Sequence, residues 1–302
     1  MTVASGSRAR LAYVAESVYG VTPATPTWQV LPDSRNSVGL EKEDIESERV
    51  RGDRQITDFR HGTRSVTGDI QIEFCRDNYD DFLEAALMGT WDGGELKAGI
   101  TRRSFTMETA FQDITQFKRS TGCEIATMSL EIAPNSMVTG TFGIVGQDGK
   151  MYQAAVAGST YTPAPTTRVY DGFSGSIFLG SIEIGVITEI SLSLENNLEN
   201  QAVVGRNTTI QGAAGRSNLT AEISAFFEDA TIFDHFDDED EVSIVFELND
   251  GHTAYEFEMP RCKLNGGKPE VGDDREVTLS VPVQALRDDT AQSQIIITKT
   301  VL

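Results

Sequence analysis

One 25-residue stretch of alternating sequence constrains the fold of this chain more than any other. Residues 50–74 read VRGDRQITDFRHGTRSVTGDIQIEF, a polar loop followed by a strand pattern in which Val66, Ile70 and Phe74 face one way. Alternation with period two predicts a strand with one face on a core. Residues 203–227 repeat this pattern 153 positions later, without a gap, with six identities that include Phe74 and Phe227. Self-similarity at a fixed spacing favours an internal duplication.

The order of predicted elements supports the duplication. Each half reads strand, long loop, strand, helix and then further strands, and a second offset of 139 positions aligns Cys123 with Cys262. The first helix is predicted over residues 76–89, with Asp77 as its N-cap and Gly89 at its end. The second helix is shorter, with Asp229 as the cap before Ile232, Phe233 and Phe236.

A stretch rich in Gly, Ser, Thr and Pro, at residues 147–175, has the composition of a linker between the halves. We therefore predict a mostly β chain with an N-terminal arm (1–36) and two tandem domains (37–160 and 161–302). Each domain has one flanking α-helix. Asn249-Asp250-Gly251 predicts a hairpin turn, and Pro282 predicts an edge strand or a bulge.

Composition restricts the function classes. The chain has 302 residues and a net charge of −21, which argues against ordinary binding to a nucleic-acid backbone. No apolar run reaches the ~18–20 residues of a membrane span, and we expect no export by a signal peptide. The cysteines are odd in number and lack CxxC spacing, so we predict small buried hydrophobes rather than disulfides or zinc ligands: Cys75, Cys123 and Cys262.

Residues 1–36 are expected to form an arm, because a polar segment with three prolines does not build its own core. Its start is basic, and its aromatic side chains would be exposed apolar surface on a free tail. We therefore expect the arm to dock on a neighbouring subunit, and a frayed terminus is the alternative. The residues on which this expectation rests are Arg8, Arg10, Tyr13, Tyr19 and Trp28.

The loop Ser47–Arg64 is unusual for its positive charge on a very acidic chain. It also contains three acids, and it is longer than most loops between two strands. An electrostatic contact with an acidic partner, such as a second copy, and a solvated hairpin tip are both open interpretations. Its arginines are Arg49, Arg51, Arg54, Arg60 and Arg64.

Motifs of enzyme chemistry are missing from the sequence. The histidines His61, His235 and His252 have no metal-ligand spacing, and no nucleophile, dinucleotide or phosphate-binding motif occurs. The acidic run HFDDEDE at 235–241 is the best metal candidate, but it lacks the spaced ligands and central glycine of a calcium loop, so a solvated turn is favoured. We interpret Asp80 and Asp81 as surface charge rather than a catalytic pair. We predict no enzyme activity and no cofactor.

The order of motifs resembles the tail tube proteins of long-tailed bacteriophages. The resemblance covers most of residues 10–150 and extends to 176–302 only through the internal repeat. The residues that carry it are Tyr13, Glu16, Ser17, Tyr19, Gly20 and Pro23 in the arm; Gly62, Gly68 and Ile70 after the arginine-rich loop; Tyr79, Asp80, Leu83, Glu84 and Ala85 in the helix; and Ser104–Ile114, Gly122 and Val138–Phe142 beyond it.

The resemblance implies that each domain is β-sandwich or barrel-like. It also implies a structural virion protein, in which copies join their sheets into a ring and rings stack into a tube that conducts DNA to the host cell. The usual ring holds six single domains, so two domains in one chain imply a trimer that imitates a hexamer. The resemblance also implies a place in the virion tail, assembly in the host cytoplasm, and partners that include the tape measure protein and tail-end proteins. An acidic lumen would let DNA pass without specific binding.

Under this interpretation the ring-stacking loops are Ser47–Arg64 and the corresponding Asn200–Arg216, the latter with Val204, Arg206 and Arg216. A hexamer is the alternative, if the second half is an outward decoration. A ring-forming neck or distal-tail adaptor of the same fold is the alternative function. A carbohydrate-binding or hydrolytic β-protein is a third, but the only tryptophans, Trp28 and Trp91, are not paired.

Overall fold

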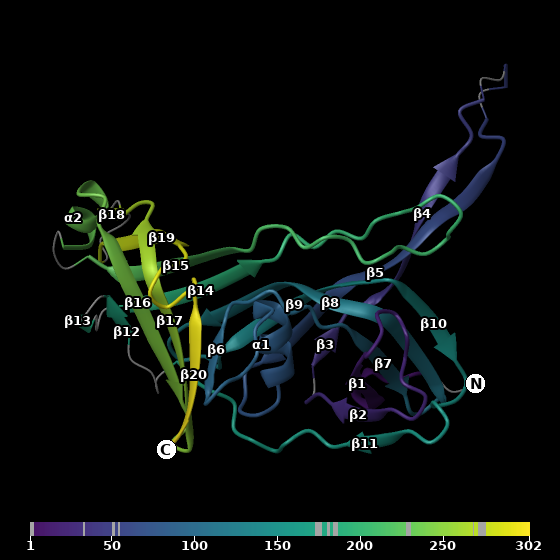
Figure 1. The fold of residues 1–302 in the computed structure, drawn as a ribbon, viewed down its shortest axis with the longest axis horizontal. Coiled ribbons are helices and arrows are strands. Elements are labelled where there is room, and N and C mark those ends of the chain that lie inside the picture. Colours follow the sequence, from purple (N-terminus) through teal and green to yellow (C-terminus); the bar gives the residue numbers. More distant parts are fainter. Residues whose placement is uncertain are drawn as a thin grey trace.

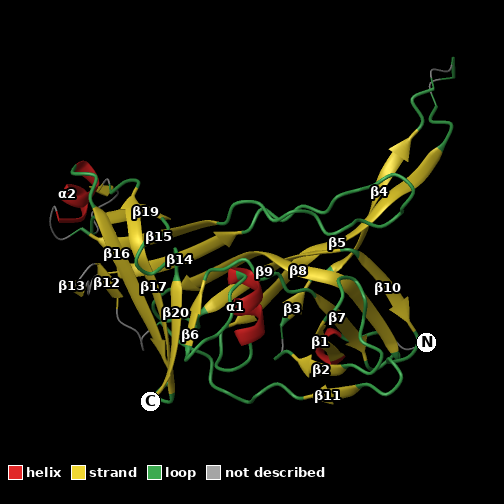
Figure 2. Cartoon of the chain, in the orientation of Figure 1, coloured by secondary structure: helices red, strands yellow, loops and turns green. Residues whose placement is uncertain are grey.

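The computed structural model describes residues 3–32, 34–49, 52–53, 55–172, 177–179, 182–183, 187–227, 231–267, 269–270 and 276–302. The prediction of a mostly β chain is confirmed, as Figure 2 shows. Among these residues the helical elements are few and short, namely η1 (Gly6–Arg8), α1 (Asp80–Leu87) and α2 (Thr231–Asp237).

Most strands lie close to the predicted alternating segments, but strands also form within the expected arm, residues 1–36, and within the expected linker, residues 147–175. Those of the first half are β1 (Ala9–Ala15), β2 (Thr27–Val30), β3 (Arg35–Asn36), β4 (Gly39–Glu46), β5 (Phe59–Glu73), β6 (Glu95–Lys97), β7 (Phe105–Phe111), β8 (Gln116–Ile132), β9 (Thr139–Gly146), β10 (Asp148–Tyr152) and β11 (Thr160–Thr162). Those of the second half are β12 (Ile177–Leu179), β13 (Ile182–Glu183), β14 (Ile187–Glu195), β15 (Asn218–Phe226), β16 (Glu241–Asn249), β17 (Thr253–Leu264), β18 (Pro269–Glu270), β19 (Thr278–Ala285) and β20 (Ile296–Val301).

One antiparallel sheet runs through both halves of the chain (Figure 1). Its strands follow the order β4–β5–β9–β8–β14–β15–β19. Further strands form a second layer in each half. In the first half β7 and β10 pair with the start of β8, and β1 pairs with β7. In the second half β16 and β20 pair with β17. Because β8 bends at a register shift after Ile125, it belongs to both layers.

The two halves repeat the same strand pairings. The order β4–β5–β9–β8 of the first half recurs as β14–β15–β19–β17 in the second. The registers agree with the sequence offsets: Ile70 pairs with Phe142, and Ile223 pairs with Val281, which lie 153 and 139 positions later. The β18 strand completes the correspondence, because Pro269 pairs with Leu279 as Leu130 pairs with Gly140.

A single hydrophobic core is continuous between the halves. Phe74, which is 1% exposed, lies with its ring centroid 5.5 Å from that of Tyr255 and 5.7 Å from that of Tyr170. The helix α1 fills the first half with Phe82, whose ring packs on Tyr13 and Phe105. The three cysteines are buried free thiols, as predicted.

The first helix is shorter than the predicted 76–89, because Asp77 does not cap it. Asp77 has a φ of 64°, and the residue before the helix is Tyr79, which makes no side-chain cap. The Asp77 carboxylate instead accepts a hydrogen bond from Lys299, 2.6 Å away. The apolar stripe that predicted the helix is buried, and the chain turns at Met88 in a left-handed conformation. The predicted cap of the second helix, Asp229, lies outside the described residues.

The expected arm and linker are integral parts of the fold. Strand β1 pairs with β7 over its full length, and β11, inside the expected linker, pairs in parallel with β2. Trp28 and Tyr13 are buried by strands of their own chain. The expectation of an intersubunit arm rested on aromatic side chains that needed cover, and the chain supplies that cover itself.

The turn and proline predictions both have a structural counterpart. Asn249-Asp250-Gly251 connects β16 to β17, and Gly251 has the positive φ of 81° that such a turn favours. Pro282 lies inside β19, where β15 pairs on one side. On the other side the pairing is interrupted between Leu264 and Pro269, and the Asn265 N–H donates to the Pro282 carbonyl. Pro282, which has no backbone N–H to donate, therefore lies beside a bulge in the neighbouring strand.

Candidate assembly surfaces

The contact between the halves is itself a strand pairing. Strand β14 pairs with the end of β8 in antiparallel fashion, from Ile190 opposite Ile132 to Glu195 opposite Thr127. Beneath this sheet junction, β6 of the first half pairs with β20 of the second, with Leu96 opposite Ile297. The first half thus joins the second by main-chain hydrogen bonds, as neighbouring strands of one sheet do.

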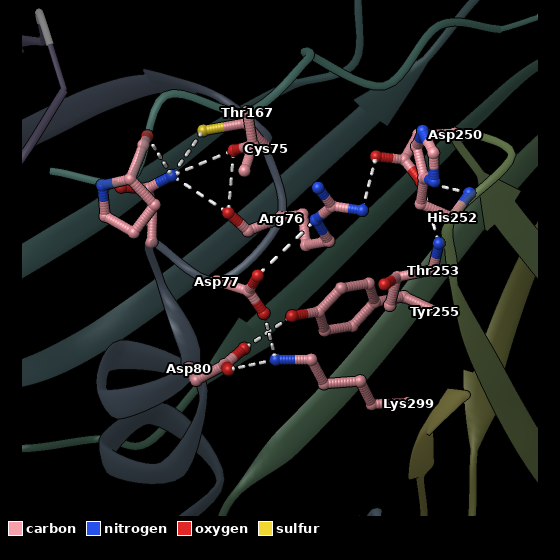
Figure 3. A network of polar contacts seen from close by, with 12 residues as sticks. Cys75, Arg76, Asp77, Asp80, Thr167, Asp250, His252, Thr253, Tyr255 and Lys299 are labelled. Atoms are coloured by element: carbon pink, nitrogen blue, oxygen red, sulfur yellow. Dashed lines mark hydrogen bonds and ion pairs between the residues drawn. The ribbon is translucent and has the colours of Figure 1, made fainter. Parts of the chain in front are cut away.

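A polar network fixes the start of α1 against the second half (Figure 3). Asp80 accepts a hydrogen bond from the Tyr255 hydroxyl at 2.6 Å and another from the Lys299 ammonium at 2.5 Å. Burial and the charge of Asp80 raise the pKa of Tyr255, so its hydroxyl remains a donor. Burial alone lowers the pKa of Lys299, but its hydrogen bonds to Asp77 and Asp80 outweigh that effect and raise it.

The same network corrects the interpretation of Asp80 as surface charge, whereas Asp81 is exposed, in agreement with that interpretation. Asp80 contacts the second half as described, and Asp81 accepts a hydrogen bond from the Tyr13 hydroxyl at 2.9 Å. Both groups connect α1 to strands far away in the sequence. Sequence reasoning missed them because their partners are separated from them by 175 and 68 positions.

Two strand edges of the long sheet have no partner among the described residues. At one end β3 and β4 pair only with β5, and at the other β18 pairs only with β19. Figure 1 shows these edges at opposite ends of the molecule. Unpaired edges invite strand addition from another chain.

The second hairpin, residues 196–217, connects β14 to β15 and lies along the first half. Its backbone makes a parallel bridge between Thr208 and Arg64, with the Arg64 N–H donating to Asn207 at 2.8 Å. Asn200 donates to the Gly146 carbonyl at 2.6 Å. Gln211 donates to the Glu124 carboxylate at 2.9 Å. The tip is exposed, and Val204 at its end is fully exposed.

The first hairpin, β4 with the start of β5, projects away from the body of the molecule (Figure 1). Three of its apolar side chains are exposed without cover: Ile45 at 57%, Ile56 at 66% and Phe59 at 47%. Large apolar side chains gathered on a projecting element indicate a contact surface.

The predicted stacking residues fall into distinct environments. Arg49, Arg206 and Arg216 are exposed, and Arg60 lies 3.7 Å from Asp58 with most of its side chain in solvent. Arg64 points inward instead, where it pairs with Asp148 at 2.7 Å. The remaining two, Arg51 and Arg54, lie outside the described residues.

The arm residues are held by contacts within the chain. Arg10 stacks on the Tyr161 ring at 3.7 Å, and Tyr161 donates to the buried carboxylate of Glu108 at 2.6 Å. Arg8 ends η1, and Tyr19 is partly buried beside Gly122. Burial, followed by the charge of Glu124, raises the pKa of Tyr19.

Glu16 is a structural centre that sequence reasoning did not single out as a site. Its carboxylate accepts hydrogen bonds from the Gly20 and Gly122 backbone N–H groups at 2.7 and 2.9 Å. It also accepts them from the hydroxyls of Ser104 and Thr106 at 2.8 and 2.7 Å. The signal was present in the sequence, because Glu16 precedes a glycine turn after an alternating strand.

One face of the long sheet is polar over both halves, and we call it the polar sheet face. Its side chains alternate with core residues on β5, β9, the end of β8, β14, β15 and β19, and they are mostly hydroxyls and carboxylates. No Lys or Arg occurs among the residues that these strands direct to this face. Its exposed carboxylates are Asp69, Glu73, Glu131, Glu189, Glu195 and Glu222.

Among the described residues, no group of three or more His, Cys, Asp or Glu side chains has a geometry that could hold a metal ion. Within the acidic run at 235–241, His235 lies 3.1 Å from Asp240. No helix in the described part of the chain is long and apolar enough to cross a membrane.

Two unpaired sheet edges, a projecting hairpin and a long polar sheet face define a structural β-protein of the kind that associates through its strands. A family model described as phage tail tube protein matches residues 6–285 of the chain. The chain therefore belongs to the phage tail tube protein family, and it is a structural component of a phage tail. No curated protein matched the sequence.

Proposed function

We propose that this protein is the repeating subunit of a tail tube, in which three copies close a pseudo-hexameric ring and rings stack into a tube that conducts DNA. The observation that carries the proposal is the β8–β14 junction. It joins two halves that have the same strand order and the same registers, so it is a template for the junction between one copy and the next.

The template specifies which edges meet. The offset of 139 relates the end of β8 to residues 266–271. The paired part of β14 corresponds to residues 36–41, by an offset of 154 that follows from the registers of β14 with β15 and of β4 with β5. Ser191 pairs with Glu131 within the chain. The corresponding pair joins Ser37 of one copy to Glu270 of another. Both segments lie at the sheet edges that have no partner among the described residues, so this contact pairs both edges.

The arrangement is heterologous, because one edge of each copy meets the other edge of the next. Such contacts form a ring when the rotation between units closes. Each copy contributes two halves that we interpret as tandem domains, 37–160 and 161–302, so three copies supply the six domains of the usual ring. Strand pairing around the whole ring removes every edge of the long sheet.

The polar sheet face is the proposed lumen. Its carboxylates repel the DNA phosphates, and its hydroxyls offer no fixed positive charge to retain them. DNA therefore slides past this surface without specific binding. The exposed tips of both hairpins, with Arg49, Arg60, Val204 and Arg206, remain the proposed stacking contacts between rings. Assembly in the host cytoplasm, with the tape measure protein and tail-end proteins, completes the proposal.

Electron microscopy of the concentrated protein, with rotational analysis of end views, tests this proposal. Tubes with threefold symmetry and six similar lobes are expected. Tubes with true sixfold symmetry would refute the trimer and make the second half an outward domain. Single rings that never stack would contradict the tube and indicate a neck or distal-tail adaptor.

A further inference from the structure

We propose that the stem of the first hairpin of each copy lies in a groove on the second half of the next copy, within the plane of the ring, and so clasps the two copies together. The tip of the hairpin stays available for the stacking contacts between rings. This inference rests on the proposed ring. It adds a second contact besides the strand junction, with a second copy of this chain as the occupant. It also gives the exposed apolar side chains of the first hairpin a partner.

The two hairpins correspond in length and register. Leu198 bridges to Ala214 in the second hairpin, and the corresponding residues of the first, Asp44 and His61, are paired in the β4–β5 ladder. The second hairpin continues beyond the β8–β14 junction and crosses the first half at Gly146, Gln147 and Arg64. A copy added at the β18 edge directs its first hairpin across the corresponding part of the second half.

The corresponding part of the second half is an open groove. A groove of about 790 Å³ is lined by three residues that correspond to the first-half contacts of the second hairpin. Ser217 lies 153 positions after Arg64. Ala285 and Leu286 lie 139 positions after Gly146 and Gln147. Ile100, which is 94% exposed, is also part of the lining. The first half's version of this surface is covered by the second hairpin, whereas the groove is empty within the chain.

The charges at the proposed contact are complementary. Within the chain, Gln211 donates to Glu124. The corresponding residues are Asp58 in the first hairpin and Lys263 in β17, at offsets of 153 and 139. Inside the chain this contact joins the neutral amide of Gln211 to the carboxylate of Glu124. Between copies the corresponding contact would be an ion pair between Asp58 and Lys263. Because this pair exists only between a first hairpin and a second half, it favours the head-to-tail order.

Disulfide trapping tests the clasp. The offset of 153 relates Thr208 to Gln55 and Arg64 to Ser217. The bridge between Thr208 and Arg64 therefore predicts that Gln55 of one copy lies beside Ser217 of the next, and we combine Gln55→Cys with Ser217→Cys. The native cysteines are buried and do not compete. Copper phenanthroline with oxygen accepts the two electrons and two protons that the thiols lose as the S–S bond forms. We expect most chains to migrate as covalent multimers on non-reducing gels, and dithiothreitol to return them to monomers.

The control pair is Gln55→Cys with Thr300→Cys, which places the second thiol on an exposed residue of β20 that does not line the groove. It should remain monomeric on the gel. Microscopy of the same samples separates the two proposals. Threefold tubes without covalent multimers in the Gln55/Ser217 pair overturn the clasp and leave the ring intact. If neither the wild-type protein nor the variants form rings at any concentration, the ring and the clasp that rests on it are both overturned.

Discussion

Replacing Tyr255 by Phe should measure how strongly the polar network fastens α1 to the second half. The Tyr255 ring is fully buried, and its hydroxyl donates to Asp80 at 2.6 Å. Phe keeps the ring contact with Phe74, so the substitution creates no cavity. It removes one hydrogen bond to an ionised carboxylate, which is worth about 1.5–3 kcal/mol. Asp80 retains Lys299 as a partner, so we expect a loss of about 2 kcal/mol in the free energy of unfolding.

Urea denaturation followed by tryptophan fluorescence provides the assay. Trp91 reports on this region directly, because its indole N–H donates to the Asp80 backbone carbonyl at 3.4 Å. The matched control is Tyr152→Phe on strand β10, where the side chain is 40% exposed. That variant should change the stability by less than about 0.5 kcal/mol. Equal stability of Tyr255→Phe and the wild-type protein would refute the claim that this hydrogen bond helps to hold the halves together.

Four further predictions follow from the geometry. Glu16→Ala leaves four donors without their acceptor, and we expect urea denaturation to show a loss of about 3 kcal/mol or more. The folded-state pKa of Lys299 is raised, so its stabilisation is complete below the ordinary lysine pKa of about 10.4 and is lost as the pH rises through the raised folded-state pKa. The melting-temperature penalty of Lys299→Met should therefore shrink over that rise in pH. Asp58→Lys and Lys263→Glu should each reduce tube yield in sedimentation assays, and the double exchange should restore it, whereas additive losses would contradict an ion pair. Glu222→Lys should leave tubes intact but make them retain DNA in a salt-sensitive manner, and tubes that still retain none would contradict the polar sheet face as the lumen.

Local patterns in the sequence were sufficient to predict the strands and their repetition. The alternation around Ile70 and Ile223 specifies which side chains face the core, and the two sequence offsets reappear as strand registers. These features depend on near neighbours and on duplicated spacing, which a sequence displays directly. The amphipathic stripe of α1 was predictable for the same reason.

The features that sequence reasoning missed depend on distant partners. Asp77 looked like a helix cap, but its carboxylate turns to Lys299, 222 positions away. Trp28 looked like part of an arm that docks on a neighbouring subunit, but strand β11 passes beside β2 and the Tyr161 ring stacks over the indole at 6.2 Å. Neither partner is signalled by local composition, because tertiary contacts override local propensity. The groove beside Ser217 was equally invisible, since residues from widely separated segments form it.

The β8–β14 junction joins two strands of the same chain, which affects how quickly a ring can assemble. A strand pairing within one chain forms by a unimolecular step, whereas a pairing between chains costs translational and rotational freedom and depends on concentration. In the proposed ring every second junction is internal, so a complete ring has three junctions between chains, whereas a ring of six single-domain copies has six. Nucleation of such a ring should therefore depend on protein concentration with a lower reaction order.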